Sequence, residues 1–95
     1  MQNKLKLLIT LEASFEISGR GVVLVPFIEP EIIGDMKHGD KAQVRLVLPA
    51  GSEIMADATF CWEHFNPSGF HFLCTLSSAT QPIPKGTEVW LLEDS

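Results

Sequence analysis

The residues with the clearest chemical potential are two cysteines and two histidines at mirrored spacing. Cys61-x-x-His64 precedes His71-x-x-Cys74, and cysteine and histidine are the usual ligands of structural zinc. The turn Asn66–Gly69 between them predicts a β-hairpin in which His64 faces His71 and Cys61 faces Cys74. Because strand positions three apart point to opposite sides, the two cysteines then share one face and the two histidines the other.

This register favours a packing role for the cysteines. Cys61 and Cys74 are expected in the core beside neighbouring phenylalanines, with His64 and His71 outside. Zinc held by all four side chains would require a bulge that turns one pair over. A disulfide between the facing cysteines would require an oxidising compartment. Both stay open as alternatives to the core role.

No other set of residues in the sequence identifies a reaction. The chain has neither a G-x-S-x-G nucleophile elbow nor a G-x-x-x-x-G-K-[ST] phosphate loop. The carboxylate pairs Glu29/Glu31 and Glu93/Asp94 fall in expected loop or terminal positions, and His38 falls in a turn. We therefore predict a protein that is not an enzyme and that carries no cofactor.

The elements that position these residues are predicted to be strands. Apolar and β-branched segments alternate with Gly, Pro and Asp turns, which is typical of an antiparallel all-β domain. The expected strands are Lys4–Ile17 (with a break near Ala13-Ser14 left open), Val22–Ile28, Ala42–Leu48, Glu53–Glu63, Gly69–Leu76 and Glu88–Leu92. Six short strands in 95 residues predict one small closed barrel that spans the whole chain.

One strand is apolar at both alternating positions. Both faces of Val22–Ile28 therefore need cover. Its outward side chains, Val23, Val25 and Phe27 or their complement, are either covered by the loop Glu29–Asp40 or exposed as an interface. The sequence leaves both possibilities open.

Composition limits the classes of partner. The formal net charge is -5, from seven Lys and Arg against twelve Asp and Glu, whereas nucleic-acid binders usually carry a basic stripe. The start of the chain has lysines followed by leucines, but this apolar stretch is short and ends at Glu12 without a cleavage site. We interpret it as a strand and expect a cytoplasmic protein without a membrane span.

A segment near the start resembles a known family. Phe15–Val23 reads F-E-I-S-G-R-G-V-V and resembles the F-x-I-x-G-R-G-x-V hairpin that opens the second domain of elongation factor Tu and related translation GTPases. Further pieces follow in the family's order as far as Leu92: Ile28-Glu29, Lys37–Asp40, Phe72–Leu76 and Ile83–Val89.

The resemblance implies a six-stranded Greek-key barrel of the translation-factor second-domain type. In that family the barrel packs against a GTPase domain and contacts ribosomal RNA or the aminoacyl end of tRNA. Of the family's acidic pair before the opening Phe, Glu12 matches the first member, but Ala13 stands at the second. Pro26 and Phe27 replace a glycine and an arginine of the next strand, which indicates that the scaffold is kept and the RNA chemistry is changed.

A second family is similar more loosely. The segments from Gly39 to Pro49, Ala58 to Trp62 and Gly69 to Cys74 suggest the PilZ receptors of cyclic dinucleotides. That family needs an R-x-x-x-R arm and a D/N-x-S-x-x-G turn, and this sequence has neither.

These observations predict a non-enzymatic binding module that associates with a protein, either itself or a partner. The candidate interaction residues are Glu12, Arg20, Val23, Val25 and Phe27. The first alternative is an RNA- or ribosome-associated accessory domain, which needs its basic residues to converge on one face: Lys4, Lys6, Arg20, Lys41, Arg45 and Lys85. The second is a zinc- or small-ligand-binding barrel that uses Cys61, His64, His71 and Cys74.

Overall fold

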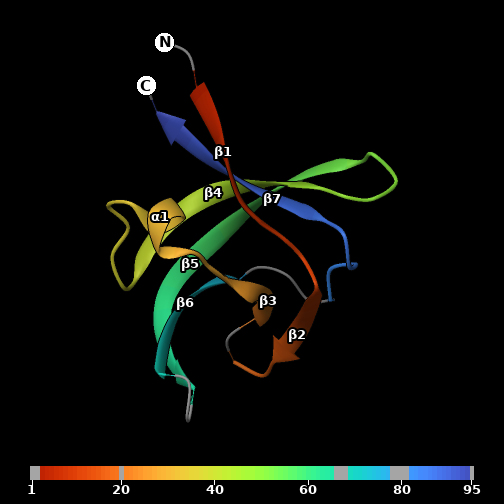
Figure 1. Cartoon of the computed structure of the whole chain (residues 1–95). Helices are drawn as coiled ribbons and strands as arrows, with labels where there is room; N and C mark the ends of the chain where they lie inside the picture. The colour runs from red at the N-terminus through yellow and green to blue at the C-terminus, as the bar shows by residue number, and fades with distance from the viewer. Residues whose placement is uncertain (1–2, 20, 66–68, 78–81, 95) are drawn as a thin grey trace.

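The computed structural model describes residues 3–19, 21–65, 69–77 and 82–94. Within these ranges seven strands form one antiparallel sheet in the order β1-β7-β4-β5-β6-β3-β2, which curls strongly (Figure 1). The strands are β1 (Asn3–Thr10), β2 (Ala13–Ile17), β3 (Gly21–Ile28), β4 (Asp40–Val47), β5 (Glu53–Phe65), β6 (Gly69–Leu76) and β7 (Glu88–Asp94), and one short helix, α1 (Pro30–Ile33), follows β3. The prediction of an antiparallel all-β structure is confirmed.

The chain passes from one edge of the sheet to the other between β1 and β2. The Leu11 N–H donates to Thr87 O at 2.8 Å, and Gly86 N–H donates to the Leu11 carbonyl at 2.9 Å, just before β7. The next residue, Glu12, donates instead to Val25 O of β3 at 3.0 Å. Two adjacent residues thus bond near opposite edges of the sheet, so the sheet must curl until these two edges lie close together.

The predicted first strand, Lys4–Ile17, is therefore two strands separated by Leu11 and Glu12, and the six expected strands become seven. Among the described residues no ladder of strand pairs joins β1 to β2, so the sheet is not closed. Hydrogen bonds of one side chain in β2 connect that strand to the segment before β7. The Ser14 hydroxyl donates to Ile83 O at 2.8 Å and accepts from Ile83 N–H at 2.7 Å.

The core lies on the concave side of the sheet and is built by alternation along each strand. In β3, Val22 and Leu24 are fully buried, and in β6 the same holds for Phe72 and Cys74. Further aliphatic and aromatic side chains from these two strands, from β1, β4, β5 and β7, from α1 and from Leu11 complete this cluster: Leu8, Ile9, Leu11, Ile28, Ile33, Val44, Leu46, Ala58, Phe60, Leu76, Val89 and Leu91.

The segment between β3 and β4 covers one end of the core. Ile33 of α1 is buried, and Ile32 and Met36 pack against the core. The turn that follows docks on β5, where Gly39 N–H donates to Phe60 O at 2.7 Å. The segment therefore covers the end of the core and does not lie over the outer face of β3. Of the two possibilities left open by the sequence, cover of the outward side chains of β3 by the loop Glu29–Asp40 is wrong.

Candidate functional site

The main candidate site is an apolar face on the outside of four neighbouring strands. In β2, β3 and β6 the residues that alternate with the core side chains are also mostly apolar. The register sets Phe15 beside Val23 and Val23 beside Thr75. We call the six side chains that result the outer apolar face: Phe15 and Ile17 of β2, Val23 and Val25 of β3, and Leu73 and Thr75 of β6.

This face holds a pocket of about 250 Å³. Its lining consists of the six residues of the outer apolar face and Glu63 of β5. Val23, Leu73 and Thr75 form the floor, with exposed fractions of 7%, 4% and 5%, whereas Phe15 at the rim is 56% exposed. Ordinary small-molecule pockets span roughly 300–1,000 Å³. This one therefore has the size for a single large side chain or a single base.

A glycine allows the β2–β3 hairpin to lie against β6. Gly21 pairs with Ile17, and its φ of 103° lies in the left-handed region that favours glycine. A Cβ atom at this position would overlap the carbonyl oxygen of Leu76 at the end of β6. Gly21 therefore brings β2 close enough for Phe15 and Ile17 to form the rim of the pocket.

The electrostatics of the face are one-sided. The four strands β2, β3, β5 and β6 contain no lysine or arginine, and they carry four carboxylates: Glu16, Glu53, Asp57 and Glu63. Glu63 is half-buried at the pocket wall and takes part in an interaction within the chain. Glu12 precedes β2 and is exposed, and Glu16 within β2 alternates with Phe15 and Ile17, so it lies on the other side of that strand. The pocket is thus apolar, with the single carboxylate of Glu63 in its lining.

The predicted interaction residues fall partly in this site. Val23 and Val25 line the pocket. Phe27 lies beyond it and stacks on His71, with ring centroids 4.1 Å apart. The Glu12 backbone bonds to Val25, while Arg20 lies outside the described residues.

Sequence reasoning missed the rim and the far wall of the pocket. Phe15 and Ile17 were assigned only to a strand and a family motif, and Leu73, Thr75 and Glu63 were not singled out. The signal was present in Phe72–Leu76, because this segment is apolar at both alternating positions, as Val22–Ile28 is. Two neighbouring strands of this kind indicate that both surfaces of the sheet are apolar.

The predicted register of the β5–β6 hairpin is wrong by one residue. Cys61 lies opposite Leu73, Phe60 opposite Cys74 and Glu63 opposite His71. A shift of one residue turns every side chain of one strand to the other face relative to its partner. Cys74 therefore lies in the core, whereas Cys61 lies on the outside next to Glu63, so the expectation that the two cysteines share one face is wrong.

The corrected register also separates the proposed zinc ligands. His64 belongs to the face of Trp62 and packs its ring against Phe70, while His71 lies on the opposite face against Phe27. The described residues contain no group of three or more Cys, His, Asp or Glu side chains placed to hold a metal. A disulfide between Cys61 and Cys74 is not compatible with their placement on opposite faces, and both are free thiols.

The two thiols have different environments. Burial raises the pKa of the Cys74 thiol from an ordinary value of 9.0 to about 12, because the charged thiolate is disfavoured away from water. Cys61 is half-buried. Cys74 is therefore an inert core residue in neutral solution.

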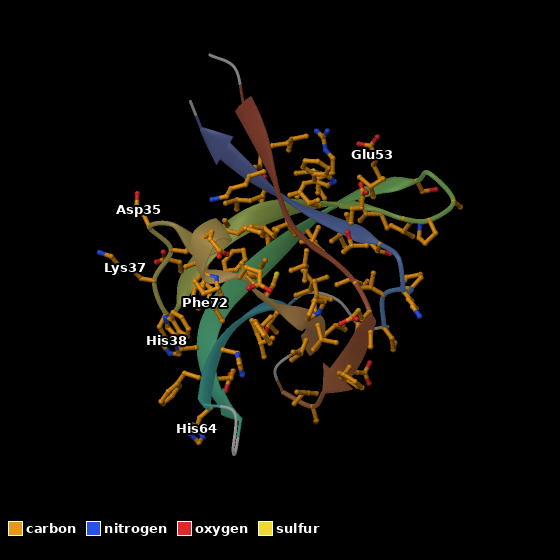
Figure 2. All side chains as sticks on the ribbon, in the orientation of Figure 1. Asp35, Lys37, His38, Glu53, His64 and Phe72 are labelled. Atoms are coloured by element: carbon orange, nitrogen blue, oxygen red, sulfur yellow. The ribbon has the colours of Figure 1, made fainter. Side chains whose placement is uncertain are left out.

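His38 has a structural bond in its turn. Its Nδ1 accepts the backbone N–H of Trp62 at 3.0 Å, so Nδ1 must be unprotonated and the ring proton sits on Nε2. Figure 2 shows Asp35, Lys37 and His38 along the segment between α1 and β4, with His64 farther down at the end of β5. These polar side chains fasten or border the end of the sheet and do not converge on the pocket.

The described basic residues do not converge on one face. Lys6 pairs across the sheet with Leu91, which in turn pairs with the buried Val44. Arg45 pairs with Trp90, which pairs with Leu7, and these three lie on the other side of the sheet. Arg45 Nε lies 3.5 Å from Glu53 Oε1. Lys6 shares a hollow with two aspartates, and Lys41 shares another with Asp57.

Comparison of the chain with protein-family models, with curated proteins and with solved structures found no match. In the part of the chain that the structure describes, no helix is long and apolar enough to span a membrane.

Proposed function

We propose that this chain is a non-enzymatic binding module that associates with another protein through the outer apolar face. The observation that carries the proposal is the pocket between Phe15, Ile17 and Glu63, with its buried floor and its exposed apolar rim. Exposed apolar surface of this kind, bordered by polar residues, marks protein interaction sites. An aromatic rim over a shallow pocket is also the usual form of an interface anchor point.

We further propose that the fold is a variant of the six-stranded Greek-key barrel of translation-factor second domains. Phe15–Val23, which carries the resemblance, forms the β2–β3 hairpin, and Phe72–Leu76 forms most of β6. If β1 and β2 are counted as one strand interrupted at Leu11 and Glu12, the number of strands is six. The contact of the two sheet edges at Leu11 supports this relation.

One observation favours a second candidate function, contact with an unpaired RNA nucleotide. The pocket lies on the same hairpin that carries the family resemblance, and it has the size for one base. A base could stack on Phe15, and the carboxylate of Glu63 could accept a hydrogen bond from a ribose hydroxyl. The four strands offer no lysine or arginine for the phosphates, and for this reason we place RNA second.

Affinity capture from native lysate with matched variants tests the proposal. Phe15→Ser removes the most exposed side chain of the rim, and Phe70→Ser is the control, because Phe70 is 66% exposed on a different face of the sheet. We expect a protein partner that stays bound after nuclease treatment. The Phe70→Ser variant should still capture this partner, and the Phe15→Ser variant should not. A bound species that disappears with nuclease would support the RNA function instead. Equal capture by both variants would refute a role for this face.

A further inference from the structure

We propose that the protein partner inserts into this pocket one large apolar side chain that has a lysine or arginine within two residues of it. This inference rests on the proposed function and specifies the chemistry of the partner. It is carried by the size of the pocket, by its apolar lining and by the distribution of charge around it.

The pocket admits one side chain and not an extended hydrophobic surface. Its floor is already closed by Val23, Leu73 and Thr75, and its volume is about 250 Å³. Phe15 and Ile17 come from β2, which is an edge strand of the sheet. A partner can therefore place one aliphatic or aromatic side chain between this edge and the wall at Glu63.

Charge favours a basic residue beside that anchor. The carboxylate of Glu63 is part of the pocket lining, and the four strands that form the face contain no lysine or arginine. A carboxylate has about four acceptor positions, so Glu63 can take a further donor in addition to its interaction within the chain. Lys41 lies on β4, beyond β5, and shares its own hollow with Asp57.

The same charges argue against a second copy of this chain as the occupant. A two-fold dimer would bring the identical face of each copy into contact. Glu63 of each copy would then lie in the interface, and the four strands offer no lysine or arginine to pair with it. Like charges in an interface oppose association, so a different protein with a basic segment fits better.

Selection from a random library of displayed peptides tests the inference. The wild-type chain is the immobilised target, and selected peptides are then measured against four variants. Phe15→Ser removes the rim and Phe70→Ser is its control. Glu63→Gln removes the pocket carboxylate, and Asp57→Asn is its control, because Asp57 lies six residues earlier on the same strand and outside the pocket.

We expect the selected peptides to contain a large apolar residue within two positions of lysine or arginine. Phe15→Ser should abolish their binding, and Glu63→Gln should weaken it roughly three- to tenfold, as for one charge-assisted pair at a half-buried carboxylate. The loss with Glu63→Gln should shrink in 0.5 M salt (about a 4 Å screening length). Thermal unfolding of each variant verifies that it is folded.

Two other outcomes separate this inference from the proposed function. Peptides that depend on Phe15 but are neutral or acidic next to the apolar residue would overturn the inference and leave protein binding at this face intact. A selection that yields no binders, or binders that are indifferent to Phe15→Ser, would overturn both. Because the composition of the peptides is read on the wild-type protein, the result does not depend on any variant being stable.

Discussion

The two halves of the sheet share one core but present different outer surfaces. In one half the strands β5, β6, β3 and β2 themselves contain no lysine or arginine, and their outer face holds the apolar pocket. The half formed by β1, β7 and β4 contains Lys4, Lys6, Lys41 and Arg45. Arg45 on β4 pairs with Glu53 at the start of β5, and the Trp90 indole N–H donates to Glu88 Oε1 at 3.1 Å within β7.

This comparison shows that apolar exposure alone does not define the site. Leu5 and Leu7 on β1 are 40% and 38% exposed, similar to Ile17 on β2. On the outside of the β1-β7-β4 half, however, the apolar side chains are interspersed with polar and charged groups that bond to one another. On the other half they adjoin buried floor residues and form a hollow. The shape of the surface, and the lack of lysine and arginine in the four strands that form it, distinguish the candidate site.

The largest expected effect is the loss of the β2–β3 hairpin on substitution of Gly21. Gly21→Ala places a Cβ atom against the backbone carbonyl of Leu76 at a positive φ, so we expect a loss of about 3 kcal/mol or more in the free energy of unfolding. Gly19→Ala is the control, because Gly19 also has a positive φ but nothing within 4 Å of an added Cβ. It should cost only about 1 kcal/mol.

Urea unfolding of both variants measures the difference. If the two variants lose the same stability, the close approach of the hairpin to β6 does not contribute to the fold, and the position of the pocket rim loses its explanation.

A second prediction concerns the buried face at Cys74. Its pKa of about 12 in the folded state lies above the ordinary 9.0, so folding favours the protonated thiol. The resulting stability is present in full below pH 9 and is lost as the pH rises toward 12. At pH 11 we expect the free energy of unfolding to be roughly 2–3 kcal/mol lower than at pH 8, by the usual 1.36 kcal/mol per pKa unit.

Cys74→Ala is the reference for this measurement, because other groups also titrate in alkali. The pH dependence of the wild type in excess of that of Cys74→Ala belongs to the thiol. An identical loss in the wild type and in Cys74→Ala would mean that Cys74 is not buried as described.

The smallest expected effect compares the two outer faces directly. Phe15→Ser and Leu7→Ser each remove an exposed apolar side chain, from opposite halves of the sheet, and each should change stability by less than about 1 kcal/mol. Binding of an apolar fluorescent dye should fall severalfold in Phe15→Ser and remain near the wild-type level in Leu7→Ser. An equal loss of dye binding in the two variants would show that the apolar surface around Phe15 binds apolar molecules no better than the surface around Leu7.

Much of the fold could be predicted from the sequence. Gly21–Ile28 and Gly69–Leu76 lie within a residue of their predicted ranges, because turn residues and the apolar period mark strand ends locally. The sequence left open a break near Ala13-Ser14, and the actual break lies two residues earlier, at Leu11 and Glu12. Only their partners at opposite edges of the sheet distinguish β1 from β2.

The candidate site was less accessible to sequence reasoning. Val23 and Val25 were identified because a strand that is apolar on both faces must expose or cover one of them. The partners across the sheet depend on register, and the register of β5 with β6 differs from the predicted one by a single residue. This one-residue difference in register places Cys61 and Glu63 on the outer face, where Glu63 forms the wall of the pocket.

The sequence by itself thus determined the strands, the hairpin at Gly21 and the presence of more apolar strand surface than one core can bury. The tertiary structure alone decided which surface faces outward and which residues meet there. The physical reason is that alternation along a strand divides its side chains into two sets but does not determine which set faces the core. Pairing between strands distant in the chain makes that choice and so places Phe15, Leu73 and Glu63 around one pocket.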